Sequence, residues 1–309
     1  MTRVVCIGEC MVELRAVGAD AFVRAYAGDV YNTAVYLKRS LPQSHVQFLT
    51  ATGDDAMSRA MRAAWATEGI DDTLAFTVDG GSPGLYLIEN DARGERRFQY
   101  WRGNSAARRW LELLQRHDET VLRGADAVYL SGISLAILSP AERTGAIQML
   151  RRLRPHVGHI AFDPNVRLRL WDTPQAAAEA AEAALSIADI ALPSTEDVRL
   201  LLRIDDPTEQ MKRIQGFGVR EVALTLGADG CLIADGDALC RLPAPAVESV
   251  IDSSGAGDAF NGAYLATRLA GGSAVAAATS GLLLGSRVVV HAGAVVPASV
   301  SHPAGHTPS

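Results

Sequence analysis

Short apolar runs bounded by turn residues recur along the chain, and most of them lack polar alternation. Continuous runs of this kind are typical of strands that are buried on both faces of a sheet. They occupy residues 3–8, 46–53, 126–132, 158–163, 188–193 and 221–227. The pattern therefore predicts a central sheet whose strands carry the core of the protein.

Segments with helical spacing of apolar residues lie between these runs. They occupy residues 55–68, 107–122, 139–154, 173–187 and 194–203. Two of them begin with typical capping residues, because Ser139 precedes a proline and Ser194 or Thr195 precedes acids. Strand alternating with helix predicts an α/β fold with a parallel sheet and helices on both sides.

Two parts of the chain depart from this alternation and predict a second, smaller sheet. Residues 82–90 and 94–103 alternate between apolar and polar positions and are joined by the turn NDARG. This pattern indicates an antiparallel hairpin with one solvent-facing side. Residues 11–29 are also extended and polar. We expect these pieces, from about 11–29 and 82–103, to form a small β-lid on the α/β core.

Composition narrows the class of protein. The chain has 309 residues, of which 48% are hydrophobic, so 1–309 can form a single domain, with a loose Pro/Ser/His-rich tail at 298–309. The net charge of −6 argues against nucleic acid as a partner. No apolar run approaches the roughly 20 residues that cross a bilayer, and the N-terminus reads as a strand, so we expect no membrane association. Four cysteines without C-x-x-C spacing indicate reduced thiols in a cytoplasmic protein.

The candidate chemistry lies in one loop, where small residues and a single acid precede a helical pattern. The first N–H groups of a helix lack internal partners and carry partial positive charge. Small residues let a phosphate approach those groups closely. We therefore predict an anion hole at Gly255, Ala256 and Gly257. The carboxylate of Asp258 would lie beside it, where it could deprotonate an attacking hydroxyl.

The alternative for this loop is a glycine turn whose acid favours the helix dipole, since short glycine motifs occur in many proteins. The sequence contains neither G-x-x-x-x-G-K-[ST] nor G-x-G-x-x-G. A P-loop fold and a dinucleotide-binding fold are both disfavoured by this absence.

The string DSSGAGDAFNGAYLA resembles the C-terminal signature of the ribokinase-like (PfkB-type) carbohydrate kinases, with Ser253 where Thr is usual. The resemblance implies a three-layer α/β/α sandwich with a β-lid over the sugar. It also implies that Asp258 is the catalytic base, that the backbone of 255–257 is the anion hole, and that ATP is the phosphoryl donor. Mg²⁺ is implied as well, with Glu196 as a water-mediated partner or only a helix-start carboxylate.

Further strings resemble the branch of the family that phosphorylates 2-dehydro-3-deoxy-D-gluconate. YWRGNSAA (100–107) and FDPNVRLRLW (162–171) are the discriminating ones, within a similarity from about residue 3 to 297. The resemblance implies transfer of phosphate to the C6 hydroxyl of this acidic sugar. A kinase for a neutral sugar such as fructose and a non-catalytic sugar- or nucleotide-sensing module are the alternatives.

The sugar site is expected between the lid and the core. Period-2 geometry puts Tyr100 and Arg102 on one face of a lid strand, where an aromatic ring and an arginine can cover a sugar and hold its carboxylate. The resemblance gives sugar contacts to Gly28, Asp29, Val30, Tyr31, Asn32, Tyr86, Tyr100, Trp101, Arg102, Arg167 and Asp258. Lid packing for Tyr86 and a helix start for Val30 and Tyr31 are the alternatives.

The nucleotide site is expected around the strand and turn LTLGADG. The resemblance gives ATP contacts to Asn165, Arg167, Thr225, Gly227, Asp229, Gly230, Ser286 and the loop from Gly255 to Asp258. An ordinary β-turn is the alternative for Asp229. An exposed lid edge, together with the assembly of family members, favours a homo-oligomer.

Overall fold

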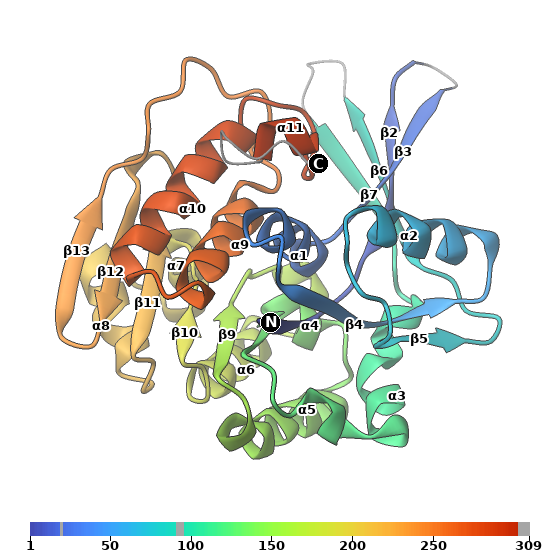
Figure 1. Ribbon diagram of the computed structural model, residues 1–309, viewed down its shortest axis with the longest axis horizontal. Coiled ribbons are helices and arrows are strands. Elements are labelled where there is room, and N and C mark those ends of the chain that lie inside the picture. The colour runs from blue at the N-terminus through green and yellow to red at the C-terminus, as the bar shows by residue number, and fades with distance from the viewer. Residues whose placement is uncertain (19–20, 91–95, 302–309) are drawn as a thin grey trace.

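The computed structural model describes residues 1–18, 21–90 and 96–301. Their strands form one large sheet and one small sheet (Figure 1). The large sheet has nine strands in the order β13-β12-β11-β10-β9-β8-β1-β4-β5. These strands are β1 (Arg3–Ile7), β4 (His45–Gly53), β5 (Ala75–Val78), β8 (Ala127–Ser131), β9 (His159–Asp163), β10 (Ile190–Ala191), β11 (Glu221–Thr225), β12 (Cys231–Asp235) and β13 (Ala238–Leu242). Pairing is parallel from β5 through β11, whereas β12 and β13 are antiparallel.

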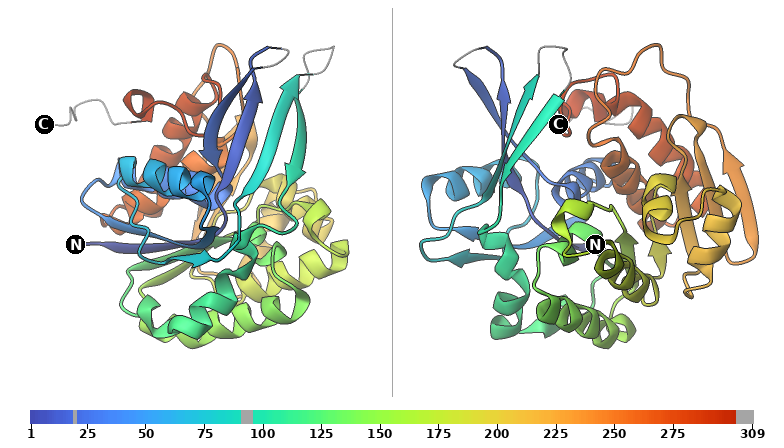
Figure 2. Two further views of the ribbon diagram at one scale, coloured as in Figure 1. Left: turned by 90° about the vertical axis from the view of Figure 1, so that its right-hand side faces the viewer. Right: turned by 180° about the vertical axis from the view of Figure 1, so that it is seen from behind.

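Helices cover both faces of this sheet and complete three layers. One face is covered by α1 (Asp29–Ser40), α2 (Ala56–Thr67), α9 (Ala256–Leu269) and α10 (Ala274–Val288). The other is covered by α3 (Trp110–His117), α4 (Gly132–Ala136), α5 (Pro140–Leu153), α6 (Pro174–Leu185), α7 (Thr195–Leu202) and α8 (Pro207–Gln215). Figures 1 and 2 show the two helical layers with the sheet between them. The predicted α/β/α sandwich is confirmed.

Most predicted helices agree with the structure to within two residues, and both serine caps are present. Ser139 and Ser194 each accept a hydrogen bond from the backbone three residues on, in reciprocal capping boxes. The segment predicted as one helix over 107–122 is instead broken into η1 (Ala106–Arg109), α3 and η2 (Glu119–Leu122). Asp118 causes the break, because its backbone is extended and its carboxylate accepts a bond of 2.8 Å from Thr120 N.

The small sheet is the predicted lid. Its strands are β2 (Met11–Ala16), β3 (Phe22–Ala27), β6 (Gly84–Asn90) and β7 (Arg96–Trp101), in the order β3-β2-β6-β7. The hairpin β6–β7 is antiparallel as expected, but β2 pairs with β6 in parallel. Figure 2 shows the four strands projecting together beyond the main sheet. The turn NDARG lies outside the described residues, apart from its first one.

The end of the chain departs from the expected loose tail. Residues 298–301 form α11 (Ala298–Ser301), and the side chain of Ser301 is buried. The rest of the expected tail, 302–309, lies outside the described residues. Among the helices that the structure describes, none is long and apolar enough to span a membrane.

Candidate active site

A cleft of about 580 Å³ opens between the lid and the edge of the main sheet where the parallel strands end. Asp163 at the end of β9 and Thr225 at the end of β11 lie in its floor. Tyr86 and Tyr100 line it from the lid. Ligands bind at this edge of open α/β sheets, so the cleft occupies the position that the sequence predicted.

Asp258 lies in the first turn of α9, half-buried in the wall of the cleft. Its Oδ2 accepts a hydrogen bond of 2.7 Å from Nδ2 of Asn32 on α1. Burial, and to a smaller extent the carboxylate of Asp29, raise the pKa of Asp258, whereas the Asn32 bond and Arg167 lower it, and together they bring the pKa to about 7. A carboxyl with a pKa near neutrality is suited to accept a proton at physiological pH.

The backbone next to Asp258 offers free hydrogen-bond donors. The N–H groups of Gly257 and Asp258 have no partner within the described part of the chain, whereas Ala256 N donates to Ser253 O at 3.3 Å. A Cβ added to Gly257 would meet no atom within 4 Å, so this backbone is open to the cleft. The N–H groups of Gly257 and Asp258 are therefore available to bind an anion, whereas that of Ala256, which the sequence prediction included in the anion hole, is already paired.

Close packing of two helices brings Asn32 to Asp258. A Cβ on Gly262 of α9 would lie 2.7 Å from the Cβ of Tyr36 and 2.8 Å from Thr33 O, both on α1. Only a glycine therefore allows α9 to approach α1 this closely. This close packing brings the amide of Asn32 on α1 within 2.7 Å of the carboxyl of Asp258 on α9.

The loop after β9 forms a polar network under the cleft. Asp163 Oδ1 accepts from Asn165 N at 3.0 Å, and its Oδ2 accepts from Asn261 Nδ2 at 2.8 Å. Burial and three neighbouring carboxylates raise the pKa of Asp163 well above its usual value. Asn165 has a left-handed backbone, with φ of 32°, and its Nδ2 donates to Asp29 Oδ2 at 2.7 Å. These bonds hold a conformation that is uncommon for a non-glycine residue.

The sequence did not predict Asp163 or Asn261 as site residues. Both lie inside strings already recognised, FDPN and GDAFN. Asn261 follows Asp258 by three positions, so on a helix the two share one face. This spacing could have identified Asn261 as a site residue. Its partner Asp163 lies about a hundred residues earlier in the sequence, so only the fold reveals their contact.

The aromatic face of the lid is confirmed. The rings of Tyr86 and Tyr100 stack at 5.6 Å between centroids, and both line the cleft with Arg102. The hydroxyl of Tyr86 donates to the buried carboxylate of Glu13. These contacts give the lid an aromatic surface toward the cleft, of the kind that packs against a sugar ring.

Arg102 is buried and already has one acidic partner. Its Nη2 pairs with Glu9, whose other oxygen accepts from the hydroxyl of Ser105. Its Nε is buried and has no hydrogen-bond partner among the described residues. An unpaired buried donor is costly unless a ligand satisfies it, so Arg102 retains a donor for an anionic group.

Arg167 and Arg169 are exposed and line the cleft. Neither has an acidic partner within the described residues. The guanidinium of Arg169 lies 4.0 Å from the ring centroid of Tyr100, a stacking that leaves its in-plane N–H groups available. The sequence prediction included Arg167 and missed Arg169, although they are two residues apart in one string.

Several expected site residues lie elsewhere. The side chains of Val30 and Tyr31 are buried in the core on α1, and Trp101 lies on the lid face opposite Tyr100 with 55% of its surface exposed. The hydroxyl of Ser286 donates to Leu283 O within α10. The lining of the cleft includes Gly28, Asp29, Asn32, Asn165, Glu196 and Thr225, but it does not include Gly227, Asp229, Gly230 or Ser286.

Residues 1–300 match the pfkB family of carbohydrate kinases, and the chain belongs to that family. It is 42% identical over 303 residues to the 2-dehydro-3-deoxygluconokinase of Dickeya dadantii, covering 96% of this chain and 97% of that protein.

Among solved structures, a PfkB protein from Polaromonas sp. JS666 matches with a TM-score of 0.83 and 27% identity, covering 97% of this chain and 99% of that one. A putative ribokinase II from E. coli in complex with ATP and Mg²⁺ matches with a TM-score of 0.82 and 23% identity, covering 96% and 95%. The ribokinase-like fold expected from the sequence is confirmed.

Proposed function

We propose that this protein is an ATP-dependent kinase that transfers a phosphoryl group to the C6 hydroxyl of 2-dehydro-3-deoxy-D-gluconate. The observation that carries the proposal is the placement of Asp258, whose pKa is about 7, beside the N–H groups of Gly257 and Asp258, which have no partner among the residues that the structure describes. The similarity to the Dickeya dadantii enzyme over almost the whole chain supports the choice of substrate. The product is 2-dehydro-3-deoxy-6-phospho-D-gluconate.

In this reaction Asp258 accepts the proton of the attacking hydroxyl. Asn32 donates to Oδ2, which leaves Oδ1 of the same carboxylate for the alcohol. The N–H groups of Gly257 and Asp258 donate to the phosphate oxygens, on which negative charge increases during transfer. Binding of the sugar under the aromatic lid excludes water, which would otherwise compete as the phosphoryl acceptor.

The residues present fit Mg·ATP. The open backbone at Gly257 can receive a phosphate group, and Thr225 and Glu196 line the same cleft. Within the described residues, no three His, Cys, Asp or Glu side chains are placed to hold a metal ion. This suits Mg²⁺, which keeps several waters and binds mainly to substrate phosphates. When bound, the ion neutralises charge on the phosphate oxygens, and Glu196 would contact it through water.

The cations of the cleft favour an acidic sugar over a neutral one. Arg102 keeps a free buried donor, and Arg167 and Arg169 have no acidic partner among the described residues. Arg167 lies close enough to Asp258 to lower its pKa, and we therefore assign Arg167 to the transferred phosphate. Arg102 and Arg169, beside Tyr100, then remain for the sugar carboxylate.

We also propose that the enzyme acts in the cytoplasm as a homo-oligomer. The outer face of the lid exposes Phe22 and Trp101, with 48% and 55% of their surfaces accessible, next to the half-buried Leu14, Leu85 and Leu87. A second copy of the chain would cover this apolar face. Sedimentation of the wild type against Trp101→Glu tests this, and equal masses for the two would contradict it.

A substrate panel tests the proposed function. Steady-state ADP release is measured with 2-dehydro-3-deoxy-D-gluconate, its galactonate epimer and fructose. We expect kcat/KM for at least one acidic sugar to exceed that for fructose by about a hundredfold or more, because each lost charge-assisted hydrogen bond costs about 1.5–3 kcal/mol. Equal values would contradict the proposed preference, a higher value for fructose would indicate a neutral-sugar kinase, and saturable sugar binding without ADP release would indicate a sensing module.

A further inference from the structure

The segment 293–301, which follows α10, touches Gly255, the residue at which the loop and first turn of the proposed anion hole begin. Gly255, the N-cap of α9, has a left-handed φ of 76°, and a Cβ on it would lie 2.2 Å from Ala294 O and 2.8 Å from Ala294 Cα. The backbone of Gly255 therefore rests against Ala294 with no room between them. Any displacement of Ala294 would shift the residue from which the first turn of α9 begins.

Ala294 touches the lid as well. It is buried in one small apolar cluster with Met11, Ala27, Tyr86 and Ile88, against which Tyr100 packs. It also lines the cleft. Ala294 thus contacts both halves of the site: the aromatic surface of the lid, which faces the sugar, and the loop before α9, which faces the phosphate.

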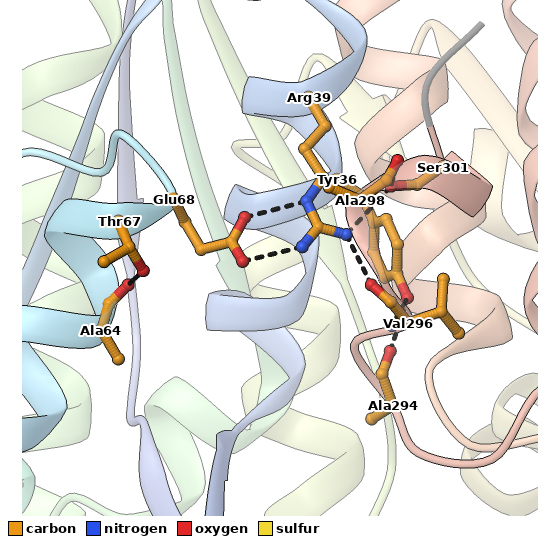
Figure 3. A network of polar contacts seen from close by, with 9 residues as sticks. All are labelled: Tyr36, Arg39, Ala64, Thr67, Glu68, Ala294, Val296, Ala298 and Ser301. Atoms are coloured by element: carbon orange, nitrogen blue, oxygen red, sulfur yellow. Dashed lines mark hydrogen bonds and ion pairs between the residues drawn. The ribbon is translucent and has the colours of Figure 1, made fainter. Parts of the chain in front are cut away.

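Tyr36 of α1 fixes the backbone on both sides of Ala294. Its hydroxyl donates to Ala294 O at 2.7 Å and accepts from Val296 N at 3.1 Å, and its side chain is fully buried (Figure 3). On the other side, Gly293 N donates to Asp252 Oδ2 at 2.7 Å. The segment is therefore held from two directions at the residues that meet Gly255 or flank this contact.

Arg39, one turn further along α1, fixes the rest of the segment. Its Nε and Nη2 donate to the two carboxylate oxygens of Glu68 at 2.8 and 2.7 Å, and its Nη1 donates to Val296 O at 2.7 Å and Ser301 Oγ at 2.9 Å (Figure 3). The guanidinium is buried, with 7% of the residue exposed. A bidentate carboxylate partner orients such a group, so Glu68 aims Nη1 at the segment.

We propose that Tyr36 and Arg39 are positioning residues for phosphoryl transfer, which act through the segment 293–301 on Gly255 and the first turn of α9. This inference rests on the proposed function of that turn as the anion hole. Neither side chain lines the cleft, so neither contacts a substrate directly. Donors aimed at a transition state lose much of their effect when displaced by a fraction of an ångström, so loosening the segment affects turnover more than binding.

Tyr36→Phe tests the inference, because it removes the two hydrogen bonds and keeps the ring. We expect kcat to fall about tenfold or more, KM for the sugar to change less than about threefold, and the apparent pKa of kcat/KM to stay near that of the wild type. Thr67→Val is the matched control, since the hydroxyl of Thr67 donates only to Ala64 O in its own helix, next to Glu68. Its kcat should equal that of the wild type.

Thermal melts of every variant separate positioning from folding. A Tyr36→Phe protein with a lowered Tm and wild-type kcat at a temperature where it is folded would overturn the proposal. Should that variant not fold, Ser301→Ala, which removes one acceptor of Arg39, takes its place. We expect Ser301→Ala to lower kcat by about threefold with its Tm nearly retained, and an unchanged kcat would then overturn the proposal.

The proposed function is judged separately, by wild-type turnover. Ratios of variant to wild type are taken with whichever sugar the wild type phosphorylates best. If the wild type did not prefer an acidic sugar, the proposed substrate would be contradicted. The ratios of variant to wild-type kcat would still test the positioning role of Tyr36 and Arg39.

Discussion

Replacing Asp258 by Asn should make the folded protein more stable at alkaline pH. Burial moves the pKa of this carboxyl from 3.8 to about 7, so the folded state binds the proton more tightly than the unfolded state does. Stability is therefore lost as the pH rises from about 4 to about 7. The full difference corresponds to at most about 4 kcal/mol. Asp258 is partly open to the cleft, and solvent screening reduces the expected gain for Asp258→Asn to about 1–3 kcal/mol.

Urea unfolding of the wild type and Asp258→Asn at pH 8 and pH 5 measures this effect. Asn keeps an oxygen acceptor for Asn32 and resembles the protonated acid, so the gain should be complete at pH 8 and about a third as large at pH 5. Asp237→Asn, in an exposed turn between β12 and β13, is the control and should show no such difference. Equal or lower stability of Asp258→Asn at pH 8 would refute the reasoning.

Three further predictions concern the site and the core. The kcat/KM of the wild type should rise with pH and reach half its maximum near pH 7, because Asp258 must be ionised to accept a proton; a flat profile from pH 6 to 8 would contradict this. Arg169→Ala should raise KM for the acidic sugar about tenfold and leave fructose kinetics unaltered; an equal effect on both would exclude a carboxylate role. Glu221→Ala should lower the free energy of unfolding by about 3 kcal/mol without changing kcat, because it leaves Arg268 and the hydroxyl of Tyr264 without their buried partner, and denaturant melts will show whether it does.

The fold was predictable wherever the signal was local. Apolar runs, serine caps and the alternating hairpin each depend on a few neighbouring residues, and they gave the layers, the lid and most helix ends. The helix expected over 107–122 failed because Asp118 can cap a new turn as well as interrupt a helix. The expected tail failed at Ser301 because its burial depends on Arg39, more than two hundred residues away.

The site residues, like the fold, were predictable where the signal was local in the sequence. Asp258 and the glycine loop lie in one continuous string, so residue type and position were sufficient to find them. Arg102 was found, but its pairing with Glu9 was not, because the two are brought together only by the lid. Trp101 follows Tyr100 in the same string and was expected to contact the sugar, but strand alternation turns its side chain to the outer face of the lid.

The most direct test of the account is the turnover of Asp258→Asn at saturating Mg·ATP and acidic sugar. If Asp258 accepts the proton of the attacking hydroxyl, kcat should fall at least about a hundredfold while KM for the sugar changes only a few-fold. The stability measurement above shows that the variant is folded under the assay conditions. Turnover close to that of the wild type would contradict the central claim.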